Sequence, residues 1–278
     1  MGKILITGSA GFIGMHTCIR FLKEGYSVVG LDNLNDYYNP NLKKLRLKEI
    51  KNSNGNTSSW KFYRMDISKK ESFEIINDED IDFVIHLAAQ AGVRYSLINP
   101  QAYINSNILG FQNVINFCLK KKIKKFFYAS SSSVYGLTKK QPFTEDFICN
   151  NPESYYASTK ISNELMAQTY SHLYKLSCTG LRFFTVYGPW GRPDMAPMIF
   201  TKAILSHKSI KIFNNGAMSR SFTYIDDIIE MTYKLINKPA TPDHKFNRNN
   251  PTTSTSWSSH RIFNLGNETS IKLLDFIQ

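Results

Sequence analysis

The sequence predicts an α/β fold in which helices cover both faces of a doubly wound parallel sheet. Short apolar runs of strand length alternate with longer stretches of helical periodicity through the first two thirds of the chain. A glycine-rich turn directly follows the first apolar run. Strands that alternate with helices are typical of βαβ units, whose strands are parallel. At 278 residues, the chain is long enough to bury a large core of this kind.

The individual elements are expected where apolar runs, caps and helix breakers place them. Runs rich in Val, Ile, Phe and Tyr predict strands at 3–7, 27–32, 60–66, 82–89, 124–131 and 177–184. Apolar residues three or four positions apart predict helices at 12–23, 68–77, 100–120 and 153–175. Further on, we expect a helix at 198–208, an extended segment at 210–214, a strand and an Asp-capped helix at 221–236, and a polar loop at 239–260. Residues 1–177 are predicted to form a nucleotide-binding domain, and 178–278 mainly a substrate-binding region interleaved with the sheet.

The formal net charge of +12 raises the question of an anionic partner. Much of the excess lies in two runs, at 43–48 and 120–125, which we expect to be solvated faces. No helix-turn-helix, zinc-finger or aromatic RNA-binding pattern accompanies them. A small anionic substrate explains the basic character as well, so nucleic acid is not a predicted partner.

The cysteines and the first residues predict a cytoplasmic protein. Cys18, Cys118, Cys149 and Cys178 form no CxxC pair and have no neighbouring histidines, which favours reduced thiols over metal ligands. The start MGKILITG lacks the features of a secretory signal, and Ile6 stands where a myristoylation pattern needs Ser or Thr. No apolar run approaches the about 20 residues of a membrane span, so no membrane partner is expected.

The turn TGSAGFIG after the first strand predicts a dinucleotide-binding loop of Rossmann type. Gly8, Gly11 and Gly14 stand at three-residue spacing, and Phe12 and Ile13 begin the following helix. Glycines here allow a tight turn and a close approach of the backbone to a diphosphate, which the helix N-terminus attracts. The pattern alone is weak, but its place between a first strand and a first helix strengthens it.

Other strand ends supply the remaining candidate cofactor contacts. Asp32 ends the second strand, where a carboxylate accepts hydrogen bonds from ribose hydroxyls, with Asn33 beside it. No arginine is adjacent, so NAD is predicted over NADP; the alternative is an Asp32 that only serves the turn. Asp66 and Ile67 are expected to flank the adenine. The end of the fourth strand should approach the cofactor through Leu87, Ala88 and Ala89.

The stretch YASTK predicts a catalytic pair on one helix face. Tyr156 stands four residues before Lys160, so their side chains share a face. A neighbouring ammonium stabilises a phenolate, which makes a tyrosine a usable base near neutral pH. The alternative is an ordinary pair on a helix surface.

In this order and spacing, the glycine loop, Asp32, ASSSSVYG (129–136) and YASTK resemble the extended short-chain dehydrogenase/reductase family, whose members include nucleotide-sugar epimerases and dehydratases. More narrowly, the segments 31–47, 86–100, 181–197 and 219–228 are similar to those of UDP-glucuronate 4-epimerases. The resemblance implies bound NAD, a UDP-sugar substrate and a homodimer formed through the helices near 100–120 and 153–175.

The resemblance also implies the catalytic roles. Tyr156 corresponds to the family's base, Lys160 to its partner, and Ser131 to the residue that hydrogen-bonds the sugar's 4-oxygen, with Ser132 and Ser133 as the next choices. Related dehydratases carry acidic residues just before VYG for water elimination, whereas this chain has serines. This difference favours epimerisation.

The substrate contacts come from the second half of the chain. Arg192 and Thr185 are candidates for the sugar carboxylate, Arg220 for the diphosphate, Arg94 for phosphate or sugar, and the backbone at 212–214 for uracil. The alternatives are a solvent-facing Arg192 and salt-bridge roles for Arg94 and Arg220.

Three functions follow. The first is NAD-dependent 4-epimerisation of UDP-glucuronate to UDP-galacturonate through a transient 4-keto intermediate. The second is a 4-epimerase of neutral UDP-hexoses. The third is a silent protein that binds NAD or nucleotide sugar, because the substrate-binding region looks shortened at its C-terminus compared with the family.

Overall fold

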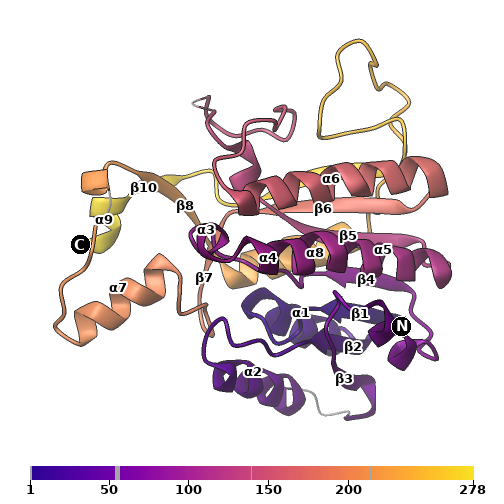
Figure 1. The fold of residues 1–278 in the computed structure, drawn as a ribbon, viewed down its shortest axis with the longest axis horizontal. Coiled ribbons are helices and arrows are strands. Elements are labelled where there is room, and N and C mark those ends of the chain that lie inside the picture. The colour runs from indigo at the N-terminus through magenta and orange to yellow at the C-terminus, as the bar shows by residue number, and fades with distance from the viewer. Residues whose placement is uncertain (1, 54–56, 139, 213) are drawn as a thin grey trace.

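A seven-stranded parallel sheet forms the centre of the computed structural model, which describes residues 2–53, 57–138, 140–212 and 214–278 (Figure 1). The strand order is β3 (Trp60–Arg64), β2 (Ser27–Asp32), β1 (Lys3–Thr7), β4 (Phe83–His86), β5 (Lys125–Ser131), β6 (Ser177–Phe183) and β9 (His260–Leu265). All the pairings are parallel. The chain reverses its direction of winding between β1 and β4, and at such a point the loops after the strands diverge and leave room for a ligand.

A second, three-stranded sheet and the helices complete the molecule. The small sheet has the order β10 (Ser270–Lys272), β8 (Ser219–Tyr224) and β7 (Thr185–Tyr187). The α-helices are α1 (Phe12–Lys23), α2 (Pro40–Asn52), α3 (Tyr95–Ile98), α4 (Pro100–Tyr103), α5 (Gly110–Lys120), α6 (Tyr155–Tyr174), α7 (Ala196–Leu205), α8 (Ile225–Ile236) and α9 (Leu273–Ile277). Short 3-10 turns lie at Thr57–Ser59, Lys70–Ile76, Ser132–Tyr135 and Asn214–Gly216, and a π-helix at Ile104–Leu109.

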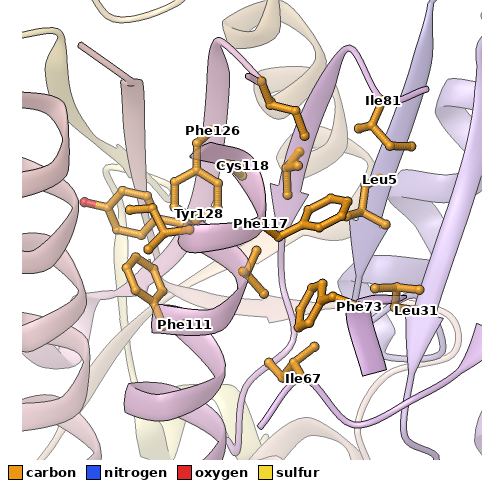
Figure 2. Close-up of a cluster of buried hydrophobic side chains, with 14 of the residues drawn as sticks. Leu5, Leu31, Ile67, Phe73, Ile81, Phe111, Phe117, Cys118, Phe126 and Tyr128 are labelled. Atoms are coloured by element: carbon orange, nitrogen blue, oxygen red, sulfur yellow. The ribbon is translucent and has the colours of Figure 1, made fainter. Parts of the chain in front are cut away.

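Each face of the large sheet has its own apolar layer, as the alternation of side chains along a strand requires. Leu5 and Phe126 face the layer of α5 and α6 (Figure 2). Ile4, Ile6 and Phe127 face the opposite layer, with α1, α2 and α8. Helices on both faces of a parallel sheet confirm the predicted Rossmann-type fold class.

Several element predictions need correction. The segment 68–77 forms a 3-10 helix over Lys70–Ile76 rather than an α-helix. The predicted helix at 100–120 is divided by the π-helix, in which the Asn107 carbonyl accepts a hydrogen bond of 2.6 Å from Asn163. The described residues of 210–214 form no strand. In α8 the N-cap is Tyr224, and Asp226 with its neighbour lies in the first turn.

One broader expectation needs correction: the basic run at 43–48 is not simply solvated, because Lys43 and Arg46 are buried. The predicted domain boundary at 177 falls on the first residue of β6, and the chain from there on contributes β6 and β9 to the large sheet. The division into two domains stays a prediction. In the described part of the chain, none of the helices has the length and apolarity to cross a membrane.

Candidate active site

A cavity of about 1560 Å³ lies along the carboxyl ends of the parallel strands and continues to the small sheet. The glycine loop lines one end and the start of β8 lines the other. The candidate residues that line it are Gly8, Gly11, Phe12, Ile13, Gly14, Asp32, Asn33, Ile67, Leu87, Ala88, Ala89, Ser131, Ser132, Ser133, Tyr156, Lys160, Thr185, Arg192 and Arg220. The structure thus brings together residues from widely separated segments of the chain.

The glycine loop fits a dinucleotide diphosphate. Gly8 has a positive φ of 72°, and a Cβ on it would lie 2.7 Å from the backbone of Ala88. Gly11 is the N-cap of α1, which has no side-chain cap and no acidic residue in its first turn among the described residues. Free N–H groups and the positive end of the helix dipole therefore face the cavity.

Gly14→Ala should weaken NAD binding about tenfold or more, because the new Cβ would lie only 2.0 Å from the carbonyl oxygen of Gly8 and the loop would have to move. Titration of NAD by isothermal calorimetry measures the change. Gly2→Ala is the control, since its methyl group would meet the Asp82 side chain and neither residue lines the cavity. Equal affinity for NAD in the Gly14 variant and the unsubstituted protein would contradict this fit.

Asp32 lies where a ribose would reach it. Its Oδ1 accepts a hydrogen bond from Leu34 N at 2.8 Å and its Oδ2 one from Ala10 N at 3.2 Å. Burial raises the pKa of this carboxyl, although the positive charge of Lys43 and both hydrogen bonds lower it. Lys43 and Arg46, which are not adjacent to Asp32 in the sequence, approach its carboxyl from α2.

The three predicted catalytic residues meet in the middle of the cavity. The hydroxyl of Ser131 donates to Ser133 Oγ at 3.2 Å and is close enough to the Tyr156 phenol to lower its pKa. Lys160 is buried, and its Nζ donates to the Ala129 carbonyl at 2.8 Å and lies 5.9 Å from the centre of the Tyr156 ring. Tyr156 and Lys160 are therefore not an ordinary pair on a helix surface.

The pKa values differ from the sequence prediction. Burial raises the pKa of Tyr156 above its ordinary value, although the Ser131 hydrogen bond and the charge of Arg192 lower it. Burial also lowers the pKa of Lys160 to about 8, against the raising effect of Glu164. The pKa of Tyr156 is therefore raised on balance, because burial outweighs the groups that stabilise the phenolate.

Arg192 lies in a polar cluster near Tyr156, and its charge lowers the pKa of that phenol. Its Nε donates to Asp194 Oδ1 at 3.0 Å and its Nη2 to Oδ2 at 2.5 Å. The Tyr37 hydroxyl donates to the same Oδ2 at 2.9 Å. Thr185, at the start of β7, lines the same cavity as Arg192. The guanidinium is therefore held in place by a bidentate ion pair and is not a freely solvated loop residue.

The remaining candidates are less central. Arg220 is exposed at the small-sheet end, where its Nη1 donates to the Ser219 carbonyl at 2.9 Å. Arg94 is exposed and outside the cavity lining. Asp66 is also outside the lining, and it accepts hydrogen bonds from Ser68. Of the predicted uracil segment, residue 213 lies outside the described residues.

Sequence reasoning missed residues that hold the catalytic groups. Asn107 is buried and donates to the Gln90 carbonyl at 3.1 Å and to Thr159 Oγ1 at 3.0 Å, which connects the loop after β4 to α6. Its position four residues after Tyr103 and four before Phe111, on a buried helix face, was the available signal.

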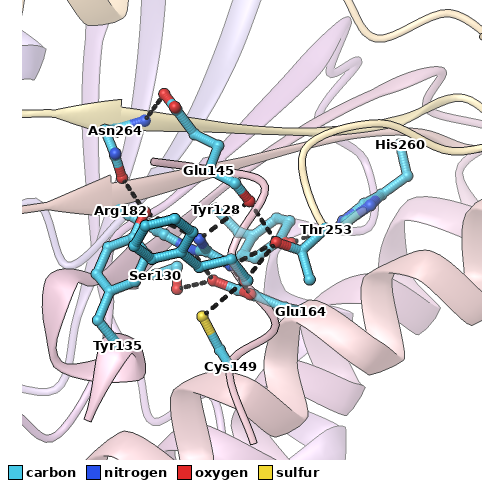
Figure 3. Close-up of polar contacts among 11 residues, drawn as sticks. Tyr128, Ser130, Tyr135, Glu145, Cys149, Glu164, Arg182, Thr253, His260 and Asn264 are labelled. Atoms are coloured by element: carbon cyan, nitrogen blue, oxygen red, sulfur yellow. Dashed lines mark hydrogen bonds and ion pairs between the residues drawn. The ribbon is translucent and has the colours of Figure 1, made fainter. Parts of the chain in front are cut away.

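A buried ion pair between Arg182 and Glu164 also holds α6 in place (Figure 3). Arg182 Nε and Nη2 donate to the two carboxylate oxygens of Glu164 at 2.9 and 2.8 Å. Nη1 donates to the Tyr135 hydroxyl at 3.0 Å. Ser130, the neighbour of Ser131, also donates to Glu164. The pair therefore joins α6, β5 and β6 just behind the catalytic residues.

Comparisons with known proteins agree with this geometry. The model of the NAD dependent epimerase/dehydratase family matches residues 4–249. Protein CapI of Staphylococcus aureus is 48% identical, over 99% of this chain and 81% of its own. UDP-glucuronate 4-epimerase 4 of Arabidopsis thaliana is 43% identical, over 99% of this chain and 62% of its own.

Among solved structures, UDP-glucuronic acid 4-epimerase from Bacillus cereus in complex with UDP-glucuronic acid and NAD superposes with a TM-score of 0.84. It is 36% identical, and the match covers 98% of this chain and 80% of that one. UDP-glucose 4-epimerase from Thermotoga maritima, with UDP-glucose, gives 0.80 at 26% identity, over 99% of this chain and 80% of its own. The chain belongs to the NAD dependent epimerase/dehydratase family.

Proposed function

We propose that this protein is an NAD-dependent UDP-glucuronate 4-epimerase that interconverts UDP-glucuronate and UDP-galacturonate. The observation that carries the proposal is the meeting of Ser131, Tyr156 and Lys160 with the anchored Arg192 in one cavity. The relatives with this activity in their names are similar over 98–99% of the chain.

The proposed proton chemistry centres on Tyr156. When bound against the glycine loop and Asp32, NAD would supply the acceptor and donor of the hydride at C4 of the sugar. Tyr156, as phenolate, takes the proton of the 4-hydroxyl and gives it back after the sugar has turned over. Ser131 donates a hydrogen bond to the 4-oxygen as it becomes a ketone. Lys160, next to the ring, stabilises the phenolate by its charge.

The sugar carboxylate needs restraint. Oxidation at C4 turns the sugar into a β-keto acid, which can lose its carboxylate in a side reaction. In that reaction the C5–C6 bond breaks, CO₂ leaves, and the electron pair forms an enolate that takes a proton at C5. We assign Arg192 and Thr185 to hold the carboxylate in an unreactive orientation. Nε and Nη2 of Arg192 donate to Asp194, so we assign the Nη1 side of the guanidinium to the sugar carboxylate. At the far end, Arg220 serves the UDP diphosphate; Arg94 lies outside the cavity and is not included.

Arg192→Ala should raise KM for UDP-glucuronate about tenfold more than KM for UDP-glucose, because only the former carries the carboxylate. Steady-state rates on both sugars measure the difference. Arg220→Ala is the matched control: it should raise KM for both sugars alike, since both carry the diphosphate. Equal effects of Arg192→Ala on the two sugars would remove this residue from the carboxylate role.

The same assay on the unsubstituted protein separates the three functions. Faster turnover of UDP-glucuronate than of UDP-glucose supports the proposal, and the reverse identifies a 4-epimerase of neutral hexoses. Bound NAD without turnover of either sugar identifies a silent binding protein. The cofactor content is measured on the denatured protein by chromatography.

We further propose a homodimer that is active in the cytoplasm. The helical layer of η3 (Ile104–Leu109) and α6 exposes several large apolar side chains, namely Ile104, Leu109, Leu165, Leu173 and Tyr174. Exposed apolar patches on adjoining helices mark association surfaces. Light scattering behind size exclusion should give twice the chain mass of 31.9 kDa. The cysteines are free thiols, which suits a reducing compartment.

A further inference from the structure

Arg46 of α2 is fully buried between two loops of the cavity. Its Nη2 donates to the carbonyls of Trp190 at 2.7 Å and Gly191 at 3.3 Å, and its Nε donates to Trp190 at 3.2 Å. Its Nη1 donates to the Ala10 carbonyl at 3.1 Å and to the Tyr38 hydroxyl at 2.7 Å. These contacts use all five N–H groups of the guanidinium, and all of these acceptors are neutral. A lysine has three donors on one nitrogen and cannot span them.

On the cofactor side, Arg46 fixes the turn that begins α1. The carbonyl of Ala10 accepts from Arg46, and the N–H of the same residue donates to Asp32. Ala10 immediately precedes Gly11, the N-cap of α1. Ala10 of the dinucleotide loop is therefore held between the carboxylate assigned to the ribose and the guanidinium.

On the sugar side, Arg46 holds the backbone that leads to Arg192. Trp190 has a φ of 63°, a left-handed conformation that costs energy for a residue other than glycine. Its carbonyl receives two of the hydrogen bonds from Arg46, and Gly191 receives a third. These bonds stabilise the unusual conformation two residues before Arg192.

A second route reaches the same arginine through side chains. Arg46 donates to the hydroxyl of Tyr38, whose neighbour Tyr37 donates to Asp194. Asp194 in turn forms the bidentate ion pair with Arg192. Arg192 is thus positioned through both its backbone and its carboxylate partner.

We propose that Arg46 is a positioning residue that couples the dinucleotide loop to the loop of Arg192, so that the cofactor and the sugar carboxylate are held in one common geometry. The inference rests on the proposed epimerase function. It follows that loss of the planar guanidinium disturbs both loops together, even when the positive charge is kept.

Arg46→Lys tests this coupling with two readouts. We expect bound NAD to exchange with isotopically labelled NAD about tenfold faster, because the charge-assisted hydrogen bond to Ala10 is lost. We also expect the fraction of converted UDP-glucuronate that leaves as a UDP-pentose to rise about tenfold, because Arg192 is no longer held. Both are measured per folded holoenzyme, so a loss of stability alone moves neither. Arg20→Lys, at a surface pair with Glu230, is the control and should match the unsubstituted protein.

The outcomes separate cleanly. Changes in both readouts support the proposal, whereas normal values in either one contradict the coupling. If Arg46→Lys does not fold, Tyr38→Phe replaces it: a smaller shift in both readouts is expected, and no shift contradicts the proposal. If the unsubstituted protein does not epimerise, the proposed function fails, but the coupling is still tested. UDP-glucuronate should then slow NAD exchange in the unsubstituted protein and not in Arg46→Lys, and equal slowing in both would overturn the coupling.

Discussion

Tyr156→Phe is expected to lower kcat about 10³-fold while the protein keeps its NAD, because the variant lacks the phenol oxygen that we propose exchanges the proton of the sugar's 4-hydroxyl. The remaining ring still packs against Tyr103, at 6.0 Å between ring centres, so the fold should be unaffected. Epimerisation rates at saturating UDP-glucuronate and the cofactor content of the purified variant test this.

Tyr155→Phe provides a matched control. Tyr155 precedes the catalytic residue, lies 38% exposed and is outside the cavity lining. The same loss of a hydroxyl oxygen should therefore leave kcat unchanged at this position. A Tyr156→Phe variant with more than about a tenth of the normal kcat would show that another group serves as the base.

Glu164→Gln is expected to lower the free energy of unfolding by about 3–5 kcal/mol, because it leaves the charge of Arg182 buried without a carboxylate. Arg182 is fully buried and Glu164 is 6% exposed, so water cannot replace the lost partner. The amide keeps the shape of the side chain, which separates the loss of charge from the loss of packing. Chemical denaturation in the presence of NAD measures the difference.

Glu230→Gln is the comparison for this variant. Glu230 also pairs with an arginine, Arg20, at 2.5 Å, but on the surface, where its side chain is 41% exposed. Solvent screens such a pair, so only a small change in stability is expected. Similar stabilities of the two variants would mean that the buried pair contributes no more than the surface one.

The local parts of the site could be predicted from sequence, because each depends on neighbouring residues. The spacing of Tyr156 and Lys160 on one helix turn and the place of the glycine loop after β1 are local features. The strand positions are also set by short apolar runs, and the alternation of strands with helices predicts their parallel pairing. Within β1, Ile4 and Ile6 face one apolar layer and Leu5 faces the other, because successive side chains of a strand point to opposite faces of the sheet.

The rest depends on contacts between distant segments. Tyr37 meets Asp194 across 157 residues of sequence, and no spacing rule links them. The interruption of the predicted helix at 100–120 needs the Asn163 side chain from another helix. The burial of Arg46 is visible in the sequence pattern, because Lys43, Arg46 and Ile50 share one face of α2. The charge of the run at 43–48, taken alone, predicts a solvated face instead.

The most direct test of the central claim is an NMR time course of UDP-glucuronate deuterated at C4 with the purified protein and no added reductant. The account predicts growth of UDP-galacturonate to a constant ratio, with the deuterium still on C4 and no pentose signal, because the hydride leaves and returns within one cavity. An unchanged substrate with NAD still bound, or a product that has lost its deuterium to solvent, would contradict it.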